Sequence, residues 1–249
     1  METVRVRDMV LGDGSIKICV PVIAHTYSEL ESVLKSLEGG SYDLLEFRAD
    51  FYFEEESRAL AAVRQASGGR PILYTIRTME EGGEIEISDD MYRERILEAC
   101  VMADMADVQL SRLHAENKNR QLHSDLVERL HEMDVKVVVS WHDFDRTPKK
   151  EVLLEKACTM EKEGCDIAKI AVMPHSRQDV LTLMDVSVQM AEGLVNCPFI
   201  TMSMGTLGKV TRAACAFTGS CITFGTQGAT SAPGQISSQS LREMLRVLS

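Results

Sequence analysis

Residues 166–174 read Asp-Ile-Ala-Lys-Ile-Ala-Val-Met-Pro, a short apolar run ended by a proline that predicts a buried parallel strand. In its middle lies Lys169, which shares one face of the strand with Ile167, Ala171 and Met173. Because both faces are apolar, desolvation would favour the neutral amine of this lysine. A neutral amine is a nucleophile suited to Schiff bases with carbonyl compounds. The alternative is a structural lysine paired with a buried carboxylate.

The same kind of run recurs along the chain and alternates with stretches of helical spacing. Eight strand–helix units in 249 residues predict an α/β fold, a (β/α)8 TIM barrel forming a single domain over residues 1–249. A doubly wound sheet is the alternative, but the Gly-rich first turn that it usually carries is absent. The expected strands are 17–23, 44–50, 71–77, 105–110, 136–142, 166–173, 198–204 and 221–225, and the expected helices are 28–38, 54–67, 89–102, 117–133, 148–163, 176–193, 208–216 and 237–248.

Two segments stand apart from this alternation. An N-terminal β-hairpin is predicted within residues 1–16, because residues 4–7 alternate in polarity and Gly12-Asp13-Gly14 can supply a turn. Residues 226–236 are small and contain Gly and Pro, which suits an active-site lid loop and equally an ordinary connection. Residues typical of helix starts precede four of the expected helices, namely Ser28, Asp89, Thr147 and Ser176.

Composition and charge exclude several classes of function. A hydrophobic content of 45% is typical of a globular protein with a sizeable core, and a net charge of −11 argues against a nucleic-acid partner. The seven cysteines contain no Cys-x-x-Cys pair, which favours a reducing cytosol. The N-terminus lacks an apolar signal core, and no run reaches the length of a membrane span. We therefore expect a cytoplasmic protein with no membrane partner.

Polar residues recur at the carboxyl ends of the expected strands, where TIM barrels carry their active sites. Each taken alone is more simply a solvated strand end, but together they converge on one rim. So much unpaired charge would be unfavourable, and a polar or anionic small-molecule substrate would account for it. No metal is expected, because the histidines at 114, 123 and 131 lack ligand spacing. The converging residues are Glu46, Arg48, Arg77, Glu81, His142, Lys169 and Arg212.

With these residues assembled, the sequence resembles the type I 3-dehydroquinate dehydratase (3-dehydroquinase) family. The shared motifs occur in family order and cover essentially the whole chain. They are Glu46-Phe47-Arg48-Ala49-Asp50, Arg77-Thr78 with Glu81-Gly82-Gly83-Glu84, Ser140-Trp141-His142-Asp143-Phe144, Lys169-Ile170-Ala171-Val172-Met173-Pro174, Met202-Ser203-Met204-Gly205 and Ser231-Ala232-Pro233-Gly234-Gln235.

The resemblance implies an enzyme of the shikimate pathway that dehydrates 3-dehydroquinate to 3-dehydroshikimate through a lysine imine, without a cofactor. It makes Lys169 the Schiff-base nucleophile, His142 the general acid and base, and Glu81 the carboxylate that orients this histidine. It also suggests a homodimer. Substrate binding would involve Glu46, Arg48 and Arg77 at the ring hydroxyls, Arg212 at the carboxylate, Ser231, Ala232 and Gln235 in the lid, and Met202, Met204 and Phe224 in the apolar wall.

Two positions depart from the commonest family pattern. Thr211 stands where Ser is frequent, and Pro21 stands where a small polar residue is common. Two further interpretations remain open at this stage. A Schiff-base aldolase on the same barrel usually takes phosphorylated substrates, and no clear phosphate-binding Gly loop follows the last strands. A binding protein that has lost catalysis would not be expected to retain the lysine, histidine and glutamate together.

Overall fold

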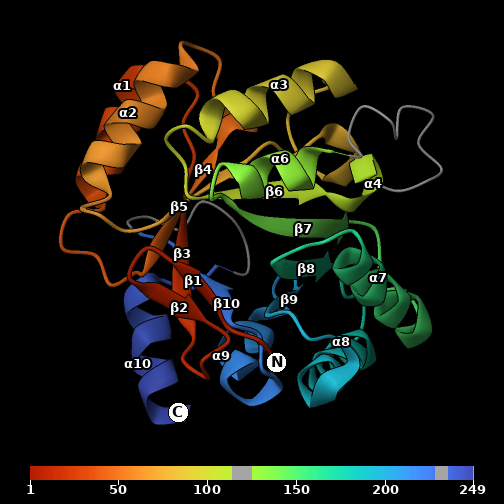
Figure 1. Ribbon diagram of the computed structural model, residues 1–249. Helices are drawn as coiled ribbons and strands as arrows, with labels where there is room; N and C mark the ends of the chain where they lie inside the picture. Colours follow the sequence, from red (N-terminus) through yellow and green to blue (C-terminus); the bar gives the residue numbers. More distant parts are fainter. Residues whose placement is uncertain (114–124, 228–234, 249) are drawn as a thin grey trace.

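The computed structural model describes residues 1–113, 125–227 and 235–248, and its eight parallel strands form a nearly closed barrel (Figure 1). The two end strands of the sheet meet where the Cys221 N–H donates to the Phe199 carbonyl oxygen at 2.8 Å. The predicted barrel is confirmed. In sheet order the strands are β10 (Ile222–Phe224), β3 (Lys17–Val22), β4 (Leu44–Arg48), β5 (Ile72–Thr75), β6 (Met105–Gln109), β7 (Lys136–Asp143), β8 (Ile167–Val172) and β9 (Phe199–Ser203).

Helices lie around the outside of this barrel, one or more after each strand (Figure 1). Each expected helix has a counterpart among the described residues, although part of the 117–133 segment lies outside them. The helices are α1 (Tyr27–Ser36), α2 (Glu56–Ala66), α3 (Asp89–Ala99), α4 (Leu110–Leu113), α6 (Leu126–Glu132), α7 (Lys150–Lys162), α8 (Arg177–Gln189), α9 (Lys209–Thr218) and α10 (Ser238–Leu248), with short turns η1 (Ala49–Phe51), η2 (Met79–Glu81) and η3 (Met190–Leu194).

The predicted helix starts are right at one position and wrong by one or more residues at three. Ser176 caps α8 in a capping box with Asp179. Ser28 and Asp89 instead lie inside their helices, because Thr26 and Ser88 accept the N-cap hydrogen bonds. Thr147 precedes α7 without capping it, and its hydroxyl donates to the Met173 carbonyl oxygen at 3.0 Å.

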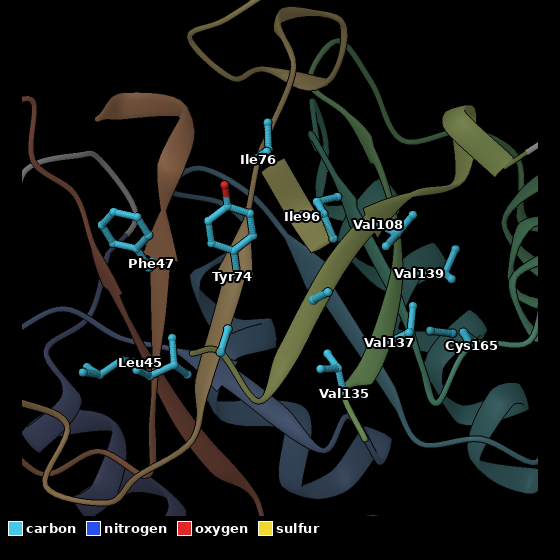
Figure 2. Packing of buried hydrophobic residues seen from close by; sticks show 14 of the residues in the cluster. Leu45, Phe47, Tyr74, Ile76, Ile96, Val108, Val135, Val137, Val139 and Cys165 are labelled. Atoms are coloured by element: carbon cyan, nitrogen blue, oxygen red, sulfur yellow. The ribbon is translucent and has the colours of Figure 1, made fainter. Parts of the chain in front are cut away.

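The strands bury their outward faces against the helices, because alternate residues of a strand point to opposite sides. Figure 2 shows this layer over β4 to β7, with Phe47 and Tyr74 on neighbouring strands. Their ring centroids lie 6.3 Å apart. The inward faces therefore carry the remaining side chains, and these fill the barrel interior.

The N-terminal hairpin closes one end of that interior. Strands β1 (Val4–Val6) and β2 (Met9–Leu11) pair antiparallel through a turn at residues 7–8, where Arg7 has a φ of 53°. The turn predicted at residues 12–14 is therefore wrong; Gly12 and Gly14 have positive φ angles and lie between β2 and β3. Val6, Met9 and Leu11 form one apolar cluster with the first inward-facing residues of the barrel strands. The site must therefore open at the carboxyl ends of the strands.

Candidate active site

The apolar cluster that includes Val6, Met9 and Leu11 forms the floor of the barrel. A polar layer lies directly above this floor. Each of its residues stands two positions after a floor residue on the same strand, so it points into the same interior. Five adjacent strands supply it, from β4 to β8, and all five side chains are buried. They are Glu46, Thr75, Asp107, Ser140 and Lys169.

Lys169 is 4% exposed, and two carboxylates hold its amine. Its Nζ lies 2.9 Å from Asp107 Oδ2 and 3.4 Å from Glu46 Oε1. It also lies 5.0 Å from the ring centroid of Phe224. The pairing with carboxylates, which was the structural alternative for this lysine, is thus present together with a position at the cavity. The environment of this lysine is therefore not purely apolar.

The residue that sequence reasoning missed is Asp107. Burial raises the pKa of its carboxyl, but Arg77 and Lys169 outweigh burial and the net pKa is lowered, so this carboxylate is ionised. Arg77 Nη2 lies 2.8 Å from Oδ1, and the Ser140 hydroxyl donates to the same oxygen at 2.5 Å. A signal was present: an aspartate at an inward position of an apolar strand requires a buried cationic partner.

His142 is held by Glu81 from beyond the end of β5. The imidazole Nδ1 lies 3.0 Å from Glu81 Oε2, and the His142 backbone N–H donates to the same oxygen at 3.1 Å. Burial, Arg77 and Lys169 lower the pKa of His142 well below its usual range, so the ring is neutral at neutral pH. Since Nδ1 donates its hydrogen to Glu81, the Nε2 lone pair is free to act as a base.

Glu81 itself is fixed by polar contacts and by the close packing of its turn. The Ser111 hydroxyl donates to its Oε1 at 2.9 Å, and burial raises the pKa of its carboxyl. The η2 turn ends at Gly82, whose φ of 78° favours glycine. A Cβ on Gly83 would lie 1.8 Å from the Arg77 carbonyl oxygen. The two glycines of the motif therefore allow the turn that carries Glu81 to His142.

The three predicted arginines differ in how they are paired. Arg48 makes a bidentate pair with Asp50 at 2.7 and 2.9 Å. Arg77 is almost fully buried and is engaged by Asp107 and Glu81. Burial lowers the pKa of the Arg212 guanidinium, which donates to the Phe224 carbonyl oxygen at 3.1 Å.

The two departures from the family pattern both have a structural place. The Thr211 hydroxyl donates to the Gly208 carbonyl oxygen at 2.7 Å and accepts from the Ser203 N–H at 3.2 Å, so it joins the start of α9 to β9. Pro21 lines the cavity from β3, at the level where the β10 ladder has already ended at Phe224. A proline is tolerated there because no neighbouring strand accepts from that position.

These residues surround a cavity of about 190 Å³ at the open end of the barrel. Glu81 lies behind His142, and Ser231 and Ala232 fall outside the described residues. Sequence reasoning also missed Thr75 and Phe144 among the lining residues, whereas Thr226 belongs to the predicted lid. The predicted residues that line the cavity are Glu46, Arg48, Arg77, His142, Lys169, Met202, Met204, Arg212, Phe224 and Gln235.

Of the predicted lid, residues 226–227 and 235–236 are described, and Thr226 and Gln235 line this cavity. Thr226 and Ser237 form a parallel bridge, in which the Thr226 N–H donates to the Ile236 carbonyl oxygen at 3.0 Å. In the described ranges, no group of three His, Cys, Asp or Glu side chains is arranged to hold a metal ion. Nor is any described helix long and apolar enough to cross a bilayer.

Comparison with known proteins assigns this geometry to a family. The model of the type I 3-dehydroquinase family matches residues 18–249. The chain belongs to this family. The 3-dehydroquinate dehydratase of Syntrophotalea carbinolica is 43% identical over 255 residues, covering 100% of this chain and 98% of that protein. The corresponding protein of Clostridium kluyveri is 39% identical, covering 99% and 97%.

Solved structures of the family share the whole fold. A type I 3-dehydroquinate dehydratase from Clostridium difficile, crystallised with covalently modified comenic acid, has a TM-score of 0.92 and 35% identity over 99% of this chain and 98% of that one. The 3-dehydroquinate dehydratase of Geobacillus kaustophilus has a TM-score of 0.90 and 35% identity, covering 99% and 96%. The predicted family is therefore confirmed.

Proposed function

We propose that this protein dehydrates 3-dehydroquinate to 3-dehydroshikimate through an imine on Lys169. Membership of the type I family supports the dehydration itself. The observation that carries the mechanism is a buried lysine beside a cavity that also contains a neutral histidine. An amine and a base at one small site are what imine chemistry next to a ketone requires.

The first stage forms the imine. His142 accepts a proton from the Lys169 ammonium, and the resulting amine attacks the C3 ketone of the substrate. The new N–C bond replaces the C=O bond, and the ketone oxygen departs as water. The overall change converts an ammonium and a ketone into a protonated imine and one water, so the nitrogen ends with the positive charge it began with.

The second stage is the elimination. The protonated imine withdraws electrons and acidifies the C2 proton, which the Nε2 atom of His142 removes. The electron pair then expels the C1 hydroxyl, which leaves as water with a proton returned by His142. Glu81 keeps the imidazole in the required tautomer throughout, because its Oε2 accepts from Nδ1. Hydrolysis of the imine releases the product and restores Lys169.

The remaining residues would bind the substrate. Arg212 is placed to bind the carboxylate, because guanidinium and carboxylate geometries match. Arg48 and Glu46 line the same cavity and can hydrogen-bond ring hydroxyls, and Arg77 would act mainly through the carboxylates it holds. The 226–236 loop, including Ser231 and Ala232, would cover the bound ring.

Reduction with sodium borohydride in the presence of 3-dehydroquinate tests the mechanism. We expect a covalent adduct on Lys169 in the wild-type chain, detected by mass spectrometry of peptides. The Lys169→Ala variant should give no adduct and almost no turnover. Turnover in a wild-type chain that yields no adduct would exclude the imine while leaving the dehydration intact.

A further inference from the structure

The Asp107 carboxylate is fixed on both of its oxygens. Oδ2 lies 2.9 Å from Lys169 Nζ, while Oδ1 accepts from Arg77 and from the Ser140 hydroxyl. The side chain is 0% exposed and is absent from the lining of the cavity, whereas Lys169 and Glu46 both line it. A substrate that enters the cavity would therefore meet the lysine without displacing Asp107 from its partners.

The fixed position of Asp107 matters for the reaction because of the charge on the lysine nitrogen. A lysine ammonium and a protonated imine each carry one positive charge on the same Nζ atom. A carboxylate already oriented toward that nitrogen needs no rearrangement when the imine forms, and such preorganised charge is effective in a water-excluded site. It also opposes loss of the imine proton, and only the protonated imine withdraws electrons strongly.

We propose that Asp107 is a further catalytic residue, the fixed counter-ion that keeps the imine on Lys169 protonated during the elimination. This inference rests on the proposed imine mechanism. The other charged and titratable groups around the lysine include Cys19 on β3, Glu46 on β4, Arg77 just after β5 and His142 on β7, with Arg48 and Arg212 at the cavity wall.

Glu46 is less suited to this role although it also faces the amine. Its Oε1 lies 3.4 Å from Nζ and accepts from the Thr75 hydroxyl at 3.0 Å. It also lines the cavity, where the substrate can hydrogen-bond to it. Removing the negative charge of Asp107 would in addition take away the nearer of the two carboxylates that compensate Arg77 near the imine. Both effects favour the neutral imine, which is a poor electron acceptor.

Asp107→Asn tests the proposal because it removes the charge and keeps the shape. We expect kcat to fall on the order of 100-fold, with a much smaller change in KM. Trapping with sodium cyanoborohydride, which reduces protonated imines, should require a lower pH in the variant than in the wild type. Acid should therefore restore adduct formation, a rescue that a purely structural role of Asp107 would not produce. Glu46→Gln should mainly raise KM.

Three results would overturn the proposal, and they are distinguishable. A folded Asp107→Asn variant with the wild-type kcat and trapping profile would exclude the counter-ion role alone. If the variant has a low kcat and acid does not restore adduct formation, the role of Asp107 is purely structural. Absence of the wild-type adduct would remove the imine mechanism and the counter-ion with it. If Asp107→Asn does not fold, Asp107→Glu replaces it: the retained charge should preserve trapping at neutral pH, and loss of that trapping would contradict the proposal.

Discussion

At the scale of single residues, the site depends on charges that compensate one another away from water. Lys169 and Arg77 bind Asp107, and Arg77 also approaches Glu81 at 3.4 Å. Removing one member leaves the remaining buried charges with fewer partners, which destabilises the fold. His142 differs because it lies among these charges in its neutral form. That neutrality links catalysis and stability to pH.

We predict that part of the pH dependence of stability comes from His142. The unfolded histidine has a pKa of about 6.5, whereas the folded one has a lowered pKa because it is buried near Arg77 and Lys169. As the pH falls below about 6.5, the unfolded chain binds a proton that the folded chain does not, so the free energy of unfolding decreases. Above that pH the contribution is fully present.

Urea unfolding at a series of pH values would measure this effect in the wild type and in His142→Gln. The wild type should lose up to about 1.4 kcal/mol per pH unit more than the variant in the acidic range. Turnover of the variant should fall by about 10²–10⁴-fold, because a general acid and base is lost. Parallel stability curves would show that the folded histidine is not held neutral.

At the scale of elements, the short η2 turn positions Glu81 against the general base His142. The η2 turn brings Glu81 from β5 to the end of β7, and it can do so only because the chain at Gly83 passes close to the Arg77 backbone. Strands β4 to β8 position the buried polar layer by simple alternation. The Glu81 contact depends instead on the conformation of a loop.

We predict that Gly83→Ala displaces this turn and lowers turnover as well as stability. The added Cβ would lie 1.8 Å from a backbone oxygen, so the turn must move and carry Glu81 away from His142. Gly39→Ala is the matched control, because its φ is 70° and nothing lies within 4 Å of the added atom. It should cost about 1–2 kcal/mol of stability with kcat unchanged. Equal kcat in both variants would contradict the prediction.

At the scale of the whole molecule, the hairpin and the active site occupy opposite ends of one barrel. The apolar floor packs on β1 and β2, and the polar layer above it opens to the cavity. This division separates residues that stabilise the fold from residues that act on the substrate. The homodimer and the cytoplasmic location suggested earlier stay predictions.

We predict that Leu11→Ala reduces stability without changing catalysis. Leu11 is fully buried in the floor, so its truncation should lower the free energy of unfolding by about 2–5 kcal/mol. Val10, on the other face of β2, is half-buried, and Val10→Ala should have a clearly smaller effect. Chemical denaturation and kcat at a temperature where both variants are folded would check this. A large loss of kcat in folded Leu11→Ala would contradict the separation of stabilising residues from catalytic ones.

Sequence by itself determined the strands, their faces and most of the cavity lining. Each strand is a local pattern, and the carboxyl ends of parallel barrel strands meet at one rim, so residues such as Lys169 and His142 could be brought together without coordinates. The 166–174 run shows this well, because its alternation alone assigned Lys169 to one face.

Only the tertiary structure decided how the charges are paired. Lys169 and Asp107 are 62 residues apart, and their 2.9 Å contact depends on the register and spacing of β6, β7 and β8. The hairpin turn at Arg7 likewise depends on which residues reach the barrel floor. Local sequence patterns predict neither the charge pairing nor the position of the turn, because both are set by packing between elements that are remote along the chain.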